Sequence, residues 1–260
     1  MQTRHTGREG EAPQMLTLYQ FTFSHFCEKA RWALDYKGLP YTPRNLLPGP
    51  HRRVVLRLAR KSTVPLLIDD GEIIQGSTEI IDHLDSKYPE HPLTPADRPQ
   101  AKESREWEAY LDEEIGVPLR LWGYYHLLPD RRLALRRMLR GAPWHARIYY
   151  PLIFPKVRER MSRYLHIDAR SARQAEQRVV TALARLDDAI ASRPYLVGGQ
   201  FTRADMTACS LLALLRVPHS ADAAKDLPEA IVRFASAHGS RPCAQWVRRT
   251  YAEHRAACYT

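Results

Sequence analysis

The hydrophobic positions in residues 16–88 alternate between short β-prone runs and longer stretches with helical spacing. Leu16–Phe21 (LTLYQF) follows a polar stretch and is typical of a strand. The next stretch, SHFCEKARWALDYKG, repeats apolar residues at helical spacing and ends at a glycine followed by a proline, so it predicts a helix. A second strand is expected over Tyr41–Leu46, and a short basic helix over His51–Arg60.

A hairpin and a third helix follow. Val64–Ile68 indicates a strand with a proline near its start, and Asp70-Gly71 is a strong turn signal before the returning strand Glu72–Ile74. The helix Thr78–Tyr88 comes next, with Ser77 as its expected N-cap. A helix between two strands implies parallel pairing and a hairpin implies antiparallel pairing, so we expect an α/β domain with a mixed four-stranded sheet.

The second part of the chain reads as helical. Residues 100–126 predict one long helix, bent before Pro118, and residues 171–192 predict a clean amphipathic helix. Thr202 opens an apolar helix that is expected to reach about Val217. Four prolines between the two parts are typical of a domain boundary. The expected organisation is a tail of residues 1–14, an α/β domain of residues 15–89, a linker of residues 90–99 and an all-helical domain of residues 100–260 with an Arg-rich insertion at about 130–170.

Composition narrows the class of protein. The 260 residues are 44% hydrophobic and 26% charged, as in a globular protein, and no run approaches the ~20 apolar residues of a membrane span. The first residues lack the apolar core of a signal peptide. The four cysteines have neither zinc spacing nor a dense disulfide pattern, so we expect a reduced, cytoplasmic setting and no metal.

The formal net charge of +10 lies mainly in the helical part, where residues 91–260 hold 27 Lys and Arg against 18 Asp and Glu. Such an excess favours either a nucleic-acid or anionic-membrane partner or a solvated arginine-rich surface. No nucleic-acid motif accompanies the charge, so the solvated surface is the preferred interpretation and no nucleic-acid partner is expected.

Several motifs carry a family resemblance by their order. A strand, the SHFCEKAR helix start, a VPLL strand before a hairpin and the GSTEI helix start together resemble the cytosolic glutathione transferase superfamily, and YLVGGQFTRADMTACSLLALL resembles the signature of its helical domain. The resemblance implies a thioredoxin-like domain followed by an all-helical domain, in a serine-type or atypical bacterial-like member with glutathione as co-substrate.

By this resemblance Ser24 stands where the family places its catalytic hydroxyl or thiol. A hydroxyl there donates to the glutathione sulfur and favours the thiolate, and a helix N-terminus adds stabilisation of the negative charge. The alternative is an ordinary serine N-cap. Cys27, three residues later, is either a reactive thiol or a core residue, and the core role is the more common one.

The resemblance also implies the residues that hold the peptide. The Val64-Pro65 bond is expected to be cis, with the backbone of Val64 pairing with the cysteinyl part of glutathione, and Ser77 binds the γ-glutamyl carboxylate at a helix N-terminus. Gly76 departs from the pattern, because many members place Glu or Gln there for the ligand's amino group. His51 is the expected basic contact to the glycyl carboxylate.

Two features of the helical part complete the prediction. Thr202-Arg203-Ala204-Asp205 is a capping-box variant, so Thr202 and Asp205 are expected to set the fold and not to catalyse. The resemblance implies that the helical domain forms the pocket for the second substrate, so the Arg-rich insertion is expected to form an apolar pocket rimmed by arginine for an anionic electrophile. The alternative is a helical hairpin with a solvated basic face.

The sequence therefore predicts a transferase that activates glutathione as a thiolate for attack on an electrophilic small molecule, and a homodimer by analogy. Two alternatives stay open. One is a non-catalytic binding or scaffold protein with this fold, favoured by Gly76 and the insertion. The other is a glutathione-dependent thiol oxidoreductase acting through Cys27, disfavoured because position 24 carries no thiol.

Overall fold

A computed structural model of the chain describes residues 16–216 and 226–255. Its sheet contains four strands, β1 (Leu16–Gln20), β2 (Tyr41–Asn45), β3 (Leu66–Asp69) and β4 (Glu72–Gln75), in the order β2-β1-β3-β4. β1 pairs parallel with β2 and antiparallel with β3, and β3 pairs antiparallel with β4. The mixed sheet predicted from the helix crossover and the hairpin is therefore confirmed.

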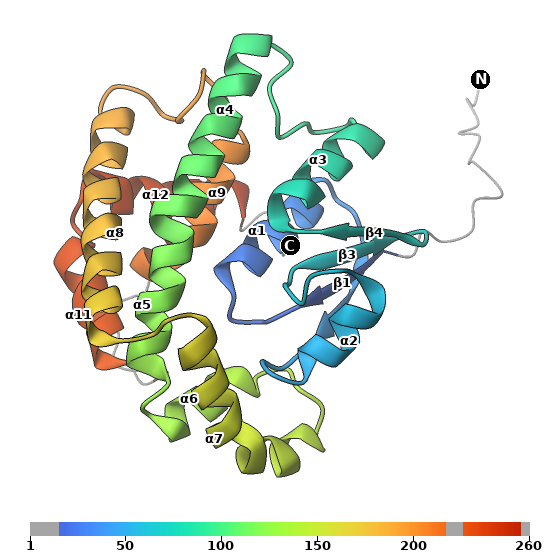
Figure 1. The fold of residues 1–260 in the computed structure, drawn as a ribbon. Helices are drawn as coiled ribbons and strands as arrows, with labels where there is room; N and C mark the ends of the chain where they lie inside the picture. Colours follow the sequence, from blue (N-terminus) through green and yellow to red (C-terminus); the bar gives the residue numbers. More distant parts are fainter. Residues whose placement is uncertain (1–15, 217–225, 256–260) are drawn as a thin grey trace, which may run out of the picture.

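Three helices belong to the sheet domain: α1 (His25–Tyr36), α2 (His51–Leu58) and α3 (Ser77–Lys87). α1 places Ala30, Ala33 and Leu34 in the core, where the helical spacing had predicted apolar contacts. The helical domain stands beside the sheet domain (Figure 1). Its elements are α4 (Arg98–Leu111), η1 (Asp112–Gly116), α5 (Val117–Leu127), α6 (Arg131–Met138), α7 (Ala146–Tyr164), α8 (Ala169–Ile190), α9 (Arg203–Leu211), η2 (Ala213–Arg216), α11 (Glu229–His238) and α12 (Pro242–His254).

The long helix predicted over residues 100–126 is interrupted by a π-helical turn, η1. Pro118 has no N–H to donate to the carbonyl four residues earlier, so a regular helix cannot continue unchanged through this point. The N–H of Val117 instead bonds to the carbonyl of Asp112, five residues back, and Pro118 sits in the first turn of α5. The interruption was expected from the proline, but its π-helical form was not.

Two further helix predictions are corrected. Ser77 is not the N-cap of α3 but its first residue; Gly76 is the N-cap, with φ at 120°, a conformation that glycine adopts readily because it has no Cβ. The helix opened by Thr202 ends as α9 at Leu211 and gives way to the 3₁₀ turn η2, and Val217 lies outside the described residues. The Thr202–Asp205 capping box is confirmed.

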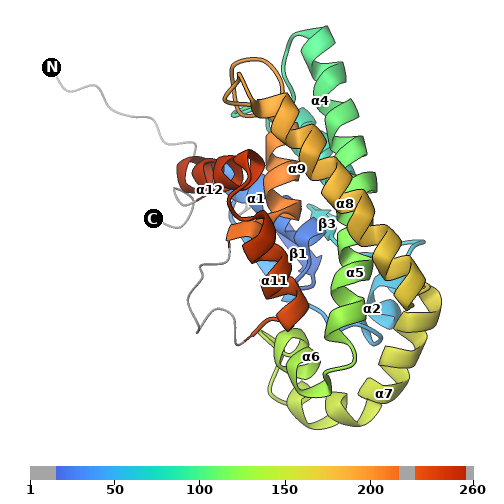
Figure 2. The same cartoon turned by 90° about the vertical axis from the view of Figure 1, so that its left-hand side faces the viewer.

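One hydrophobic core runs through both domains. Trp32 of α1, Leu111 of α4 and Leu183 of α8 belong to the same buried cluster. A second cluster binds α6 and α7 to the loop after β2, where the Tyr150 hydroxyl donates to the carbonyl of Pro48 over 3.0 Å. These two helices form a corner of the molecule at the opposite end from α12 (Figure 2).

Candidate functional site

The register of the sheet brings three sequence-predicted segments to one edge. Gln20, the last residue of β1, pairs with the end of β2, while Leu66, the first residue of β3, pairs with Gln75, the last residue of β4. Tyr19 in turn pairs with Leu66. The segments beyond these strand ends therefore leave the sheet at one edge. They carry Ser24, Val64-Pro65 and Ser77.

Ser24 is the N-cap of α1. Its Oγ accepts a hydrogen bond from the backbone N–H of Cys27 over 3.3 Å. A hydroxyl can accept and donate at the same time, so this cap leaves the Ser24 proton for another acceptor. The side chain of Arg31 braces the loop before Ser24, since it donates to the Thr22 carbonyl and to the Gln20 side chain. Capping and a chemical role are compatible at this position.

The other two segments are joined by one backbone contact. The Val64-Pro65 bond is cis, as the resemblance implied, and the N–H of Gly76 donates to the carbonyl of Pro65 over 3.1 Å. Ser77 is buried in the first turn of α3, where backbone N–H groups have no partner within the helix. An anion next to Ser77 therefore meets the positive end of α3.

The carboxylate of Glu79 occupies the space that a side chain at position 76 would take. A Cβ built on Gly76 would lie 1.9 Å from Oε2 of Glu79. The position that lacks the family's usual Glu or Gln side chain thus still has a carboxylate beside it, supplied from three residues further along the chain. The sequence motif GSTEI contains this glutamate, but its spacing gave no sign of the contact.

Cys27 lies on the inner side of α1 and is fully buried. Burial raises the pKa of its thiol, although the backbone N–H of Phe21, 3.4 Å from Sγ, acts in the opposite direction. A raised pKa and the lack of access both suppress formation of the reactive thiolate. The structure therefore favours the core role for Cys27.

His51 opens α2 and packs its ring edge-on against Phe21, with 4.9 Å between the ring centroids. Burial lowers the pKa of His51 to about 4, and the neighbouring Arg52 lowers it further. The ring is therefore neutral near pH 7, so it can offer a carboxylate a hydrogen bond but not an ion pair.

A cavity of about 720 Å³ opens beside Ser24. The loop before α1 forms one wall, α5 forms another with Leu119, Gly123 and Tyr124, and the end of α9 contributes Leu211. Gly116 sets how closely α1 approaches, because a Cβ there would lie 2.6 Å from the Phe26 ring. Val64, Pro65, Ser77 and His51 are not among its lining residues, so Ser24 is the predicted residue that faces this space.

Several polar residues of this cavity were not singled out from the sequence, and three of them lie on α1 and α5: His25, Arg120 and Tyr124. Burial lowers the pKa of His25 to about 4, helped by the charge of Arg120, and its Nε2 has no hydrogen-bond partner among the described residues. Burial also raises the pKa of Tyr124 to about 12. Arg120 lies 5.8 Å from the Phe26 ring centroid and forms no ion pair within residues 16–216 and 226–255.

A weak sequence signal for this group does exist. His25 directly follows Ser24, and Arg120 and Tyr124 are four residues apart in a predicted helix, so they share one face. The Arg-rich insertion was instead expected to line this pocket. It contributes Arg137 and Arg140, and both are bound to Asp226.

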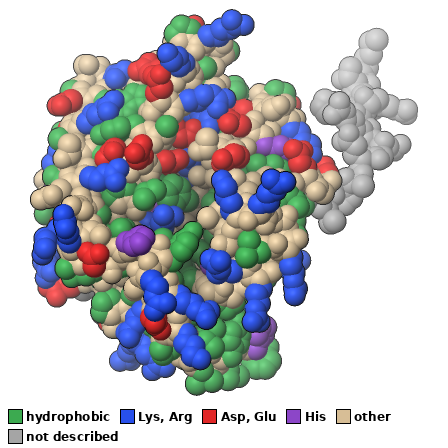
Figure 3. All heavy atoms as spheres, viewed as in Figure 1, with side chains coloured by type: hydrophobic (Ala, Val, Ile, Leu, Met, Phe, Trp, Pro, Cys, Tyr) green, Lys and Arg blue, Asp and Glu red, His purple; other side chains and the backbone are tan. Residues whose placement is uncertain are grey.

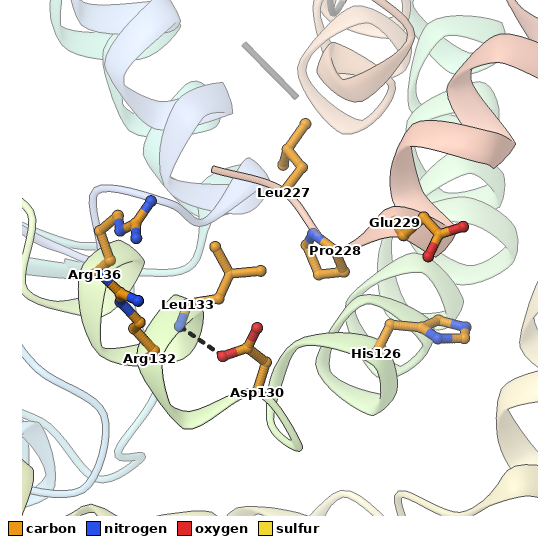
Figure 4. A pocket seen from close by; sticks show the side chains of 8 residues that line it. All are labelled: His126, Asp130, Arg132, Leu133, Arg136, Leu227, Pro228 and Glu229. Atoms are coloured by element: carbon orange, nitrogen blue, oxygen red, sulfur yellow. Dashed lines mark hydrogen bonds between the residues drawn. The ribbon is translucent and has the colours of Figure 1, made fainter. Parts of the chain in front are cut away.

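A smaller cavity of about 290 Å³ lies between α5, α6 and the start of α11 (Figure 4). Its carboxylate, Asp130, is engaged as the N-cap of α6 and accepts from the Leu133 N–H over 2.9 Å. No residue of the sheet domain lines it, but Leu227 lines both this cavity and the one beside Ser24. Across the described part of the chain, no group of three or more His, Cys, Asp and Glu is arranged to hold a metal ion. No helix in the same residues is long and apolar enough to cross a membrane.

Comparison with known proteins fits this architecture. The profile of the glutathione S-transferase N-terminal domain matches residues 18–92, and that of the glutathione S-transferase C-terminal domain matches residues 142–249. The chain belongs to the glutathione S-transferase superfamily. Together the two profiles span more than half of the chain, and they match the sheet domain and most of the helical domain.

Curated glutathione transferases resemble mainly the sheet domain. A zeta-class glutathione S-transferase of Euphorbia esula is 40% identical over 85 residues, which cover 32% of this chain and 38% of that protein. The maleylacetoacetate isomerase of Pseudomonas aeruginosa is 37% identical over 90 residues, covering 32% and 41%. The chain thus spans about two fifths of the length of these curated relatives.

Solved structures share the whole fold at low identity. The beta-etherase LigF from Sphingobium sp. strain SYK-6 superposes with a TM-score of 0.61 at 19% identity, covering 90% of this chain and 99% of that one. A glutathione S-transferase from Methylobacterium radiotolerans, in complex with glutathione sulfonate, gives a TM-score of 0.56 at 21% identity, covering 89% and 93%. These likenesses establish the arrangement of a thioredoxin-like domain and a helical domain.

Proposed function

We propose that this protein binds glutathione at the sheet edge and conjugates it through its sulfur to an electrophilic small molecule in the 720 Å³ cavity. The observation that carries the proposal is the place of Ser24. It stands at the shared edge with Val64-Pro65 and Ser77, and it also lines the cavity. A sulfur bound next to Ser24 therefore faces the space in which a second substrate fits.

The chemistry assigned to Ser24 is stabilisation of the thiolate. Its hydroxyl donates to the glutathione sulfur while its oxygen keeps the cap of α1, and the N-terminal end of that helix adds a favourable field. The thiol loses its proton to solvent. The sulfur then bonds to the electrophilic atom, and the leaving group on that atom departs with the electron pair of the bond that breaks. A superfamily member solved in complex with glutathione sulfonate supports this choice of co-substrate.

The peptide part of glutathione would lie along the edge. The backbone of Val64 pairs with its cysteinyl residue, and Ser77 with the α3 N-terminus receives the γ-glutamyl carboxylate. Glu79 then takes over the role of the side chain absent at Gly76 and binds the γ-glutamyl ammonium. His51 serves as a neutral hydrogen-bond donor to the glycyl carboxylate.

Glutathione titrations test the peptide site. Calorimetry with the wild-type chain is expected to give binding below millimolar concentration, and absence of binding at millimolar glutathione favours the scaffold alternative. Glu79→Gln removes the charge and is expected to weaken binding about tenfold. Glu90→Gln, which changes an exposed acid directly after the sheet domain, is the matched control and should leave the affinity unchanged.

Conjugation assays test Ser24. Ser24→Ala is expected to lower kcat about 100-fold, as for loss of one donor to a developing anion, whereas Ser24→Thr keeps the hydroxyl and should retain most activity. Ser86→Ala on α3 is the control. Cys27→Ala should stay active. Loss of activity in Cys27→Ala while Ser24→Ala stays active would instead support the oxidoreductase alternative.

Arg120 forms no ion pair with the described residues, which favours an electrophile that carries an anionic group. Arg31, Arg137 and Arg140 also line the cavity but bond to Glu28 or Asp226. Arg216 lies over the Tyr251 ring, 3.7 Å from its centroid, so we assign the anionic group to Arg120. Arg120→Met should lower kcat/KM by about 10- to 100-fold for an anionic electrophile and far less for a neutral one with the same reactive group. The homodimer expected from the resemblance stays a prediction.

A further inference from the structure

The net charge of the chain is concentrated at the corner formed by α6 and α7. Residues 131–173 hold 12 Lys and Arg against 2 Asp and Glu, a net charge of +10. This equals the net charge of the entire chain, so the remaining residues balance one another. The space-filling view shows Lys and Arg side chains, in blue, gathered at the lower end of the molecule next to a group of hydrophobic side chains, in green (Figure 3).

Exposed apolar side chains collect at the same corner. Within the described residues, nine large hydrophobic side chains are exposed, and five of them lie between residues 144 and 164. Trp144, Ile148 and Leu152 are 75%, 65% and 77% exposed and are spaced four residues apart. At this spacing Ile148 and Leu152 share the outward face of α7, and Trp144 stands just before its first turn.

The orientation of α7 is fixed from its other side. Tyr150, Phe154 and Val157 are buried, and Tyr150 is hydrogen-bonded to the loop after β2. The exposed stripe of Trp144, Ile148 and Leu152 therefore cannot turn inward without breaking this buried cluster. The basic side chains beside the stripe are not neutralised: Arg147, Lys156, Arg158 and Arg160 form no ion pair with any residue in the described ranges.

This combination constrains the partner. A second copy docked through this corner would bring two strongly positive surfaces together, which like-charge repulsion opposes. The phosphates of a nucleic acid would pair with the basic side chains. A nucleic acid, however, offers the protruding Ile and Leu side chains no apolar surface outside its stacked bases. An anionic bilayer satisfies both features, since acyl chains accept the apolar stripe, headgroups attract the basic residues, and Trp favours the interface.

We propose that the α6–α7 corner docks the protein onto an anionic lipid bilayer, with Trp144, Ile148 and Leu152 inserted at the level of the headgroups. This inference concerns a surface remote from the sheet edge and rests on no part of the proposed function. A protein that fails to bind glutathione can still bind the bilayer, and the reverse holds as well.

The chain contains its own reporter for this contact. Trp144 is exposed, whereas Trp32, Trp107, Trp122 and Trp246 are at most 9% exposed. Added vesicles of phosphatidylcholine and phosphatidylglycerol in equal parts should shift the tryptophan emission to the blue, and a quencher attached to the upper acyl chain should reduce it. Trp144→Phe should abolish both changes while the protein still sediments with the vesicles.

Paired surface variants separate the two contributions. Ile148→Ser with Leu152→Ser, and Arg147→Gln with Arg158→Gln, are each expected to weaken vesicle binding tenfold or more, since each basic residue near an anionic surface contributes about fivefold. Leu56→Ser on α2 and Lys102→Gln on α4 change exposed residues of the same kinds elsewhere and should bind like wild type. All four proteins should keep the wild-type circular dichroism.

Binding should vanish on pure phosphatidylcholine vesicles and decline with added salt. Absence of binding to the anionic vesicles at low salt overturns the proposal. So does equal loss in the Leu56 and Lys102 controls. Binding to a DNA duplex or to polyglutamate that matches vesicle binding, and that survives the Ile148 and Leu152 changes, assigns the corner to a polyanion and also overturns it.

Discussion

The ammonium of Lys29 lies 2.6 Å from the carboxylate of Glu108, and both side chains are almost completely shielded from solvent. Lys29 belongs to α1 and Glu108 to α4, so this ion pair joins the sheet domain to the helical domain. Arg203 adds a second contact to Glu108, at 2.5 Å, and Asp112 a second contact to Lys29, at 2.9 Å. Burial acts to raise the pKa of the Glu108 carboxyl, but the charges of Lys29 and Arg203 hold that pKa below its ordinary value.

Lys29→Met should destabilise the protein by about 3–5 kcal/mol, because it leaves buried carboxylates without their shared cation. Urea unfolding at neutral pH measures the change. Lys102→Met changes an exposed lysine that pairs with the exposed Glu106. It is the control and should stay within about 0.5 kcal/mol of wild type. Equal stability of the two variants would show that the buried pair contributes nothing.

Thr202→Ala should cost about 1–2 kcal/mol of stability without a change in glutathione affinity. The Thr202 side chain caps α9. The carboxylate of Asp205 in turn accepts hydrogen bonds from the Thr202 N–H, at 2.8 Å, and from the Thr202 hydroxyl, at 2.9 Å. Thr202→Ser keeps the hydroxyl and should recover most of the loss in thermal unfolding. An altered glutathione affinity with unchanged stability would instead place Thr202 in the binding site.

His51 should contribute to the acid sensitivity of the fold. Its pKa is about 4 in the folded protein and about 6.5 in an unfolded chain, so between these values the unfolded state binds a proton that the folded state does not. The contribution of His51 to stability is therefore complete above pH 6.5 and declines as the pH falls toward 4. Denaturant unfolding across this range should show a shallower pH dependence in His51→Gln, while an NMR titration near 6.5 would contradict the expectation.

Alanine substitution at two glycines beside the cavity should change the stability of the protein in opposite directions. At Gly116 a Cβ would lie 2.6 Å from the Phe26 ring, so Gly116→Ala should destabilise by about 1–3 kcal/mol and disturb the wall next to His25. At Gly123 nothing lies within 4 Å of a Cβ, and the residue is inside α5, so Gly123→Ala should stabilise by about 0.5–1 kcal/mol. Thermal unfolding of both variants checks the contrast; a shared sign would refute the packing argument at Gly116.

The architecture followed from local signals in the sequence. Apolar spacing predicted α1, the Asp70-Gly71 turn predicted the β3–β4 hairpin, and the capping motif predicted the start of α9. These features depend on residues close together in the chain, and for that reason they can be read from sequence. The π-helical turn η1 was missed because it depends on how α4 and α5 pack as well as on Pro118.

The site was only partly predictable for the same reason. Ser24, Val64-Pro65 and Ser77 came from motif order, and the sheet register places their segments at one edge. Glu79 and Arg120 matter through contacts with Gly76 and with the cavity, and such contacts leave no periodicity in the sequence. Burial, which the sequence does not reveal, lowers the pKa of His51, so the predicted contact to the glycyl carboxylate would be a hydrogen bond from a neutral ring.

The π-helical turn at Asp112–Gly116 has a consequence for the lineage of this chain. A π turn contains one residue more than a regular helical turn, so each later residue of α5 is set back by about 100° and about 1.5 Å from its place in an uninterrupted helix. Deleting one residue here would restore a regular helical turn and leave Arg120 and Tyr124 on the face of α5 that lines the cavity. The chain can thus gain or lose a single codon at this point while the wall-forming residues of α5 keep their orientation.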